Sequence, residues 1–341
     1  MSREVLINPY QVPDAADRIR TPVFDVPNWS ENLFFWAHDG ASGTAVFAHL
    51  SRLTPDPRMW EGAMAVLRPN GQVLIDRSIG FSADVADSGP MTFECIEPNR
   101  RWRLRFSGVV QASTSAALAT TDYLPDATSR LEMDLRFDAV NPVWSLGSEA
   151  TQQDWASFHT QQGGNVTGSI RINDESIPMD CGGFRDHSVG PRTYDGLIGN
   201  FWACCVFPSG KTFMAFKVWS EHLQQPMSRG FIATRDRIEE VDVVEAPDLA
   251  VADGSPRAIC MTLKQGQGDK KIVIEGKGET SITFHLTRPI GMRIGFRADD
   301  PKVCIDTHVA MTYTWDGETG YGWLERIRRA GYLAGQGERL V

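Results

Sequence analysis

Residues 65–75 read AVLRPNGQVLI, in which a Pro-Asn-Gly turn separates two apolar runs. A turn of this composition between two apolar runs is typical of a β-hairpin. The same design recurs at 202–219, around a Pro-Ser-Gly-Lys turn, and at 168–179 and 271–286, where we expect turns at Asn-Asp and Gly-Lys-Gly. Residues 131–137, LEMDLRF, alternate apolar and charged side chains, which predicts a strand with one buried face. The sequence therefore predicts a protein built mainly from antiparallel strands.

Helical patterns are scarce, and the best is a short amphipathic stretch at 323–333. Strands and helices do not alternate along the chain, which argues against a parallel α/β sheet and favours antiparallel barrels or sandwiches. The two large hairpins lie almost one domain length apart, and each follows a tryptophan, Trp60 or Trp202. We therefore predict two barrels of one design, at residues 1–180 and 181–341.

Composition narrows the classes of partner. The 341 residues carry 34 Lys and Arg against 43 Asp and Glu, a net charge of −9, which disfavours nucleic acid and anionic membrane surfaces. No apolar run approaches the roughly 20 residues of a membrane helix, and the first residues lack the apolar segment of a secretory signal. The six cysteines include no C-x-x-C and fit a reducing compartment. We expect a cytoplasmic protein that does not insert into membranes. The sequence is compatible with a monomer or a homo-oligomer.

The densest group of polar side chains lies in the glycine-rich segment 183–194. It comprises Arg185, Asp186, His187, Ser188, Arg192 and Tyr194. In an extended chain Arg185 and His187 face one side while Asp186 and Ser188 face the other, so only one pair would face a barrel lumen. Ionisable side chains inside an apolar barrel have shifted pKa values and become useful acids or bases. The alternative is a buried Arg–Asp ion pair that locks the junction of the barrels.

The segment GFRDHSVGPR at 183–192 resembles the Gly-x-Arg-Asp-His-Ser-Trp-Gly-x-Arg signature of bacterial proteins related to the carotenoid 1,2-hydratase (hydroxyneurosporene synthase) family. Residues 159–162, HTQQ, and 320–325, GYGWLE, also resemble that group. The resemblance implies an all-β fold of two tandem lipocalin-like antiparallel barrels with few short helices, and it implies Asp186 as the acid. Val189 stands where the signature has Trp, and the Glu-Trp that follows Asp-His in the hydratases is Ser-Val here.

Hydration or dehydration of an alkene needs an acid that protonates carbon or a leaving hydroxyl, and a neutral carboxylic acid in an apolar pocket can do this. We predict Asp186 as the acid, His187 as its partner or base, and Tyr194 or Glu325 as second proton-handling groups. Arg185 and Arg192 are predicted to orient the carboxylate, although direct pairing would lower its pKa. The further residues predicted to bind or orient the substrate are Ser188, Trp202, His159 and Gln161.

No cofactor or metal is expected. His38, Asp39 and His49 are the best metal candidates, but an alternating strand would separate them. The Gly-Lys-Gly at 276–278 lacks the third glycine and the following helix of a nucleotide-binding loop.

These observations predict a cofactor-independent lyase or isomerase of hydratase or dehydratase type, whose partner is a hydrophobic terpenoid, steroid or polyene-like molecule. Two alternatives remain: a non-catalytic lipocalin-like binding protein for an apolar small molecule, and a cyclase or pericyclase in which cavity shape holds the substrate.

Overall fold

The computed structural model describes residues 6–120, 127–147, 156–246, 258–266, 271–286, 292–294 and 301–333. The strands of the first sheet are β1 Trp29–Asp39, β2 Thr44–Leu53, β3 Asp56–Leu67, β4 Gln72–Phe81, β5 Ala86–Asp87, β6 Met91–Glu97, β7 Arg101–Thr114, β8 Ala127–Ala139, β9 Trp144–Ser145, β10 Phe158–Ile172 and β11 Glu175–Pro191. Those of the second are β12 Leu197–Val206, β13 Thr212–Ser220, β14 Met227–Thr234, β15 Arg237–Glu245, β16 Ala258–Gln265, β17 Lys271–Leu286, β18 Met292–Ile294, β19 Cys304–Trp315 and β20 Glu318–Arg329. The described helices are short: α1 Asp14–Asp17, α2 Ser115–Thr120 and α3 Ala330–Leu333.

Each sheet closes on itself. The first runs β4-β3-β2-β1-β11-β10-β8-β7, and a β4–β7 pairing closes these eight described strands into a barrel. The second runs β16-β15-β14-β13-β12-β20-β19-β17, and a β16–β17 pairing closes it in the same way. The pairings are antiparallel, which confirms the predicted all-β class of two barrels with few short helices. None of the described helices has the length and apolar character needed to cross a membrane.

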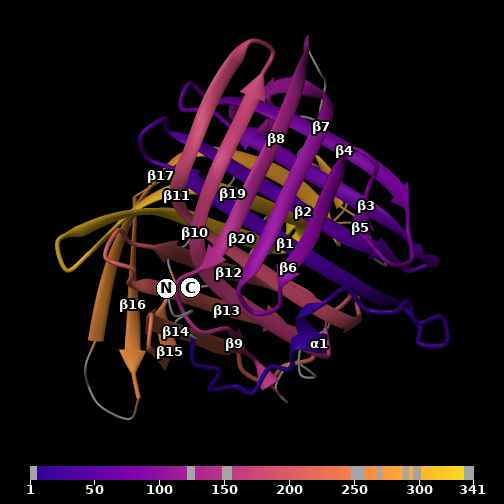
Figure 1. Cartoon of the computed structure of the whole chain (residues 1–341). Coiled ribbons are helices and arrows are strands. Elements are labelled where there is room, and N and C mark those ends of the chain that lie inside the picture. The colour runs from indigo at the N-terminus through magenta and orange to yellow at the C-terminus, as the bar shows by residue number, and fades with distance from the viewer. Residues whose placement is uncertain are drawn as a thin grey trace.

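Three large apolar clusters and a small one around Val12 form the core of the described residues. One, around Phe35, Trp102 and Leu135, contains only side chains of the first sheet and fills the first barrel. Another, around Phe201 and Phe213, fills the second barrel. The third draws on the outward faces of both sheets, for example Phe34 and Trp323, whose ring centroids are 4.7 Å apart. Figure 1 shows the indigo-to-magenta strands of the first barrel lying against the orange-to-yellow strands of the second.

Three of the predicted hairpins form at their expected turns, including the one at 173–174 between β10 and β11. Gly71 and Gly210 take φ values of 80° and 82° between β3 and β4 and between β12 and β13. Both values are readily reached only without a β-carbon. The predicted turn at 276–278 is wrong, because β17 runs unbroken from Lys271 to Leu286, with a register shift between Gly278 and Ser281.

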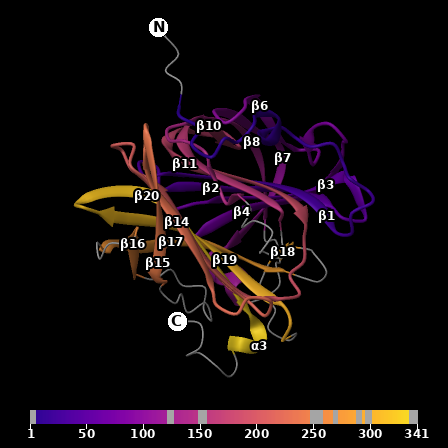
Figure 2. The ribbon, with the colours of Figure 1, turned by 90° about the horizontal axis from the view of Figure 1, so that it is seen from below.

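The helix predicted over 323–333 is also wrong for most of its length. Residues 323–329 belong to β20, and only α3, at the edge of the second barrel in Figure 2, is helical. From residue 322 to 329 every side chain of β20 is buried, because one face meets the barrel interior and the other meets the first barrel. A strand buried on both faces loses the alternation that identifies a strand in a sequence.

The boundary between the two sheets lies near the glycine-rich segment. Residues 180 and 181, where we predict the seam, lie inside β11, which pairs with β1 and β10 of the first sheet through Pro191. The chain enters the second sheet at β12. The division into domains at residue 180 remains a prediction.

Candidate active site between the barrels

A cavity of about 110 Å³ lies where the outward faces of the two barrels meet. One wall comes from β1, β2, β10 and β11, and the other from β12, β13, β17, β19 and β20. We expected the chemistry inside a barrel lumen, whereas this cavity lies between the barrels. The barrel interiors hold apolar clusters and, in the first barrel, buried ion pairs of Arg52 and Arg185. The cavity thus depends on the contact between the barrels.

Strand register brings the lining residues of each wall together. Across β10, β11, β1 and β2, the paired positions Gln161, Asp186, Phe34 and His49 form a row facing the cavity. Across β12, β20 and β19, the paired positions Trp202, Glu325 and His308 form the facing row. Neighbouring strands lie about 4.8 Å apart, so each row places its polar groups within reach of one another.

Asp186 is buried on the first wall and hydrogen bonds to His159 rather than to an arginine. Its Oδ2 meets Nε2 of His159, and the Gln161 amide nitrogen lies 3.1 Å from the same Nε2. The Trp202 indole donates to the Gln161 oxygen at 3.2 Å. An indole can only donate, so this bond turns the Gln161 NH₂ toward His159.

Nε2 of His159 joins two of the lining side chains. The Gln161 N–H points at this nitrogen, and the Asp186 carboxyl group forms a hydrogen bond with the same atom. The amide therefore constrains the imidazole and, through it, the carboxyl group. Three of the predicted residues, His159, Gln161 and Trp202, therefore act together on Asp186.

The second wall carries a carboxyl group that stays protonated. Glu325 is buried and accepts a hydrogen bond from the Asn200 amide nitrogen. Burial first, and then the nearby charges of Asp306 and Asp186, raise the pKa of Glu325 well above its usual range, against a smaller opposing effect of Arg192. Two buried carboxyl groups thus face the cavity, one from each wall.

His308 and Asp306 complete the second wall. The Trp323 indole donates to Nδ1 of His308 at 3.2 Å, and Nε2 lies 3.0 Å from Oδ2 of Asp306. Because Nδ1 accepts, Nε2 carries the proton and donates it to Asp306. His308 is therefore held in a single neutral tautomer.

Asp306, His308 and Glu325 are the one group of this kind in the described part of the chain whose donor atoms, all within 4.8 Å of one another, have a spacing suited to a metal ion. The chemistry of the donors argues otherwise. The Trp323 indole occupies the Nδ1 lone pair of His308, and Nε2 is protonated toward Asp306. An imidazole binds a metal only through a free lone pair, and His308 has none to offer. The hydrogen bonds fit a proton-handling cluster better than a metal site.

Arg192, Ser188 and Tyr194 lie at one end of the cavity. The Arg192 guanidinium donates to Ser188 Oγ at 3.0 Å and to Tyr194 Oη at 3.3 Å. Burial is the largest effect on the Tyr194 phenol and raises its pKa, so the phenol stays neutral. We expected Arg192 to orient the Asp186 carboxylate. In the structure its guanidinium donates instead to the neutral oxygens of Ser188 and Tyr194.

Arg185 and His187 point into the first barrel, away from the cavity, as strand alternation requires. Arg185 forms a two-pronged ion pair with Asp17, at 2.7 and 3.1 Å. His187 Nε2 lies 2.9 Å from Oε1 of Glu31. The predicted partnership of His187 and Arg185 with Asp186 is thus not what the structure shows. The expected Arg–Asp bridge does exist, but it joins Arg185 to Asp17.

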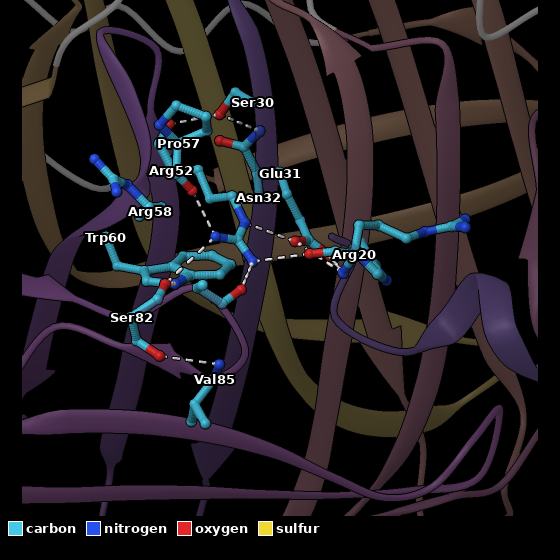
Figure 3. Close-up of polar contacts among 12 residues, drawn as sticks. Arg20, Ser30, Glu31, Asn32, Arg52, Pro57, Arg58, Trp60, Ser82 and Val85 are labelled. Atoms are coloured by element: carbon cyan, nitrogen blue, oxygen red, sulfur yellow. Dashed lines mark hydrogen bonds and ion pairs between the residues drawn. The ribbon is translucent and has the colours of Figure 1, made fainter. Parts of the chain in front are cut away.

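Glu31 links His187 to a second buried arginine. Arg52 Nε donates to Glu31 Oε2 at 3.0 Å, and its guanidinium stacks on Trp60 with 4.2 Å to the ring centroid. The backbone N–H of Arg20 donates to both oxygens of Glu31. Figure 3 shows these contacts beneath the end of the first barrel.

Five polar lining residues were not predicted for the site: Asn32, His49, Asn200, Asp306 and His308. Asp306 and His308 lie two positions apart on one strand, so they share a face, and that spacing of a carboxylate and an imidazole within an apolar segment was the available signal. His38, considered with His49 for a metal, bonds through Nδ1 to the Met311 carbonyl oxygen at 3.2 Å and does not line the cavity.

The family of the chain follows from a match that covers residues 14–330. The chain belongs to the family described as the domain of unknown function DUF7064. Among curated proteins, none matches the sequence.

Solved structures of similar fold cover almost the whole DUF7064 chain. A protein assigned as AttH from Nitrosomonas europaea has a TM-score of 0.56 at 13% identity, covering 90% of this chain and 94% of that one. Kievitone hydratase from Nectria haematococca has a TM-score of 0.54 at 10% identity, covering 95% and 96%. CghA with Sch210972 has a TM-score of 0.52 at 13% identity, covering 96% and 93%. At these identities the likeness concerns the fold.

Proposed function

We propose that this protein is a cofactor-independent lyase or isomerase of hydratase or dehydratase type that works by acid–base catalysis. The observation that carries the proposal is a buried carboxyl group, Asp186, which is hydrogen-bonded to His159 and faces a second buried carboxyl group of raised pKa, Glu325, across one cavity. The resemblance of the Asp186 segment to carotenoid 1,2-hydratases and the hydratase among proteins of similar fold support the same reaction class.

Asp186 is the proposed acid. In the hydration direction its proton goes to one alkene carbon, and the cation that forms on the other carbon takes up water. In the dehydration direction the proton goes to the hydroxyl, which leaves as water, and the cation then loses a proton from the adjacent carbon to the Asp186 carboxylate, which restores the acid. A carboxylic acid that is neutral in an apolar site acts in this way because no solvation of its anion competes for the proton.

Glu325 is the proposed second proton handler. Its raised pKa lets it hold a proton at neutral pH, and Asn200 fixes one of its oxygens. As the water nucleophile adds, its surplus proton goes to the Asp186 carboxylate, which restores the acid. Glu325 keeps its own proton and can donate a hydrogen bond that orients the water.

The rest of the lining suits an apolar reactant. Aromatic and aliphatic side chains, including Phe34, Phe47, Trp202 and Phe216, form most of the remaining wall. Aromatic faces stabilise a cation that forms during protonation of an alkene. The cavity of about 110 Å³ is smaller than the engineered 150 Å³ cavity that accommodates benzene, so a terpenoid or polyene requires its walls to separate.

The test compares Asp186→Asn with wild type on a panel of trisubstituted alkenes and tertiary allylic alcohols in heavy-oxygen water. Asn keeps the size of Asp but has no acidic proton, so the rate of label incorporation should fall by about 10²- to 10⁴-fold. Asp134→Asn, on an exposed carboxylate of the first barrel, is the control and should match wild type. Equal turnover by Asp186→Asn and wild type would contradict the proposal.

The alternative of a non-catalytic binding protein lacks a comparable observation. An apolar carrier gains nothing from several buried carboxyl groups, because their desolvation costs free energy. A cyclase or pericyclase would use the aromatic walls and leave the acid optional. Turnover of a substrate that persists in Asp186→Asn and Glu325→Gln would favour that reading.

A further inference from the structure

Arg192 stands out among the charged groups of the cavity because its contacts are with neutral oxygens. Within the described residues, no carboxylate oxygen lies within ion-pair distance, 4.0 Å, of its guanidinium, although Glu325 is near enough to feel its charge. Its Nη2 donates to Ser188 Oγ and its Nη1 to Tyr194 Oη. The Asn32 amide, turned so that its oxygen faces the guanidinium, accepts from Nε and Nη2, each at 3.1 Å.

The two buried arginines inside the first barrel, in contrast, each form an ion pair with a carboxylate. Arg52 reaches Glu31 at 3.0 Å and Arg185 reaches Asp17 at 2.7 Å. Removal of a guanidinium from water costs several kcal/mol unless a counter-charge and hydrogen bonds replace the water. Arg192 is half-buried, lines the cavity and has hydrogen bonds without a contacting counter-charge, so its charge is available to an anionic ligand there.

The remaining groups at this end do not supply that counter-charge directly. His49 is neutral, because burial, and then the Arg192 charge, lower its pKa to about 3. Tyr194 is a neutral phenol and Glu325 a protonated acid. Asp186 is engaged with His159 and Asp306 with His308.

The hydrogen bonds of Arg192 also leave donor capacity. A guanidinium has five N–H groups in a planar fork. Four are used by the bonds to Asn32, Ser188 and Tyr194. These bonds fix the plane of the fork, and the remaining Nη1–H stays available to a ligand oxygen.

We propose that Arg192 forms an anion-binding end of the cavity, and that the substrate is a branched, unsaturated molecule whose apolar body carries a carboxylate. This inference rests on the proposed function and narrows its substrate class. The carboxylate meets Arg192, and the alkene lies against Phe34 and Trp202, within reach of Asp186. Charge-assisted hydrogen bonds to arginine are stronger than neutral ones, so the guanidinium would supply both affinity and orientation.

The probes are tiglate, a small trisubstituted alkenoate, and tiglamide, its neutral amide of the same shape. Titration calorimetry measures the affinity of each for wild type and for Arg192→Gln, Arg192→Lys and Arg103→Gln. We expect wild type to prefer tiglate by about tenfold, as one charge-assisted hydrogen bond provides. Arg192→Gln should lose the preference and Arg192→Lys should retain part of it. Arg103→Gln removes an exposed charge from the same barrel and should behave as wild type.

Three results would overturn the inference. First, tiglate and tiglamide could bind wild type with the same affinity, even if both bind weakly. Second, the preference could survive in Arg192→Gln. Third, Arg192→Gln could weaken both probes by the same factor, which would mean that Arg192 only balances Asp186 and Asp306 through space. A thermal melt of each variant verifies that it is folded. If Arg192→Gln does not fold, Arg192→Lys still tests the preference for tiglate. Because binding is measured without turnover, this result is independent of the Asp186→Asn assay, so either proposal can fail alone.

Discussion

The two faces of β11 carry similar ionisable side chains, but those on the inward face form buried ion pairs and those on the outward face line the cavity. On the inward face, Arg185 and His187 meet Asp17 and Glu31 in a fully buried network. On the outward face, Asp186 meets a histidine, and the cavity keeps protonated and unpaired groups. Ion pairs hold the charged groups of the first set, whereas on the second face Arg192 has no contacting carboxylate and Glu325 retains its proton. The role of an ionisable side chain thus depends more on the group that it contacts than on its residue type.

The largest expected effect is on the inward face, where Arg52→Met removes the charge beside Glu31. Both side chains are completely buried, so the carboxylate would be left without its counter-ion. Breaking a buried pair in this way costs about 3–5 kcal/mol, which urea denaturation measures as a lower free energy of unfolding. The fraction that remains folded should keep wild-type turnover, because Arg52 does not line the cavity.

Arg103→Met is the matched control for this comparison. Arg103 pairs with Asp134 across β7 and β8, but both side chains are largely exposed. An exposed pair contributes about 0.2–1 kcal/mol. If the two arginine variants lost similar stability, burial would not distinguish the inward network from a surface pair.

A smaller effect should appear on the outward face as pH dependence. The unfolded chain releases the Glu325 proton near the ordinary pKa of 4.5, while the folded protein retains it because burial raises the folded pKa. The folded state therefore binds more protons above pH 4.5, and stability falls as pH rises toward the folded pKa. The loss approaches about 1.4 kcal/mol per pH unit.

Glu325→Gln keeps the shape of the protonated acid and should remove this slope. The measurement is the difference in free energy of unfolding between wild type and Glu325→Gln from pH 4.5 to 7. Glu175→Gln, at an exposed carboxylate, serves as control and should follow wild type. Parallel curves for wild type and Glu325→Gln would mean that Glu325 ionises normally in the folded protein.

The fold was predictable where local signals decide it. The turns at Gly71 and Gly210 and the alternation at 131–137 depend on neighbouring residues only. The errors fall in β17 and β20, where the chain is buried on both faces or carries a glycine pair that suggests a turn. In those strands tertiary packing, rather than local pattern, determines the structure.

The site was predictable only in part. Alternation correctly separates Asp186 from Arg185 and His187, but it does not identify the partner of each. His159 lies 27 residues from Asp186, and Asp306 belongs to the other barrel. Which sheet faces meet, and hence where the cavity lies, depends on the packing of two closed sheets and has no local sequence signal.

The smallest expected effect concerns the hydrogen bond from Trp202 to Gln161, which separates a positioned acid from a merely buried one. Trp202→Phe keeps an aromatic ring but loses the indole N–H, so the Gln161 amide becomes free to turn its oxygen toward His159. One hydrogen bond of about 0.5–1.5 kcal/mol corresponds to a loss of up to about tenfold in kcat. Since Gln161 would no longer constrain His159 and the acid bonded to it, the high-pH limb of the kcat profile, where a general acid loses its proton, should also move. Trp315→Phe, in the core of the second barrel, is the control and should change neither kcat nor its pH profile. If Trp202→Phe lowers kcat without moving the pH profile, Trp202 contributes only packing.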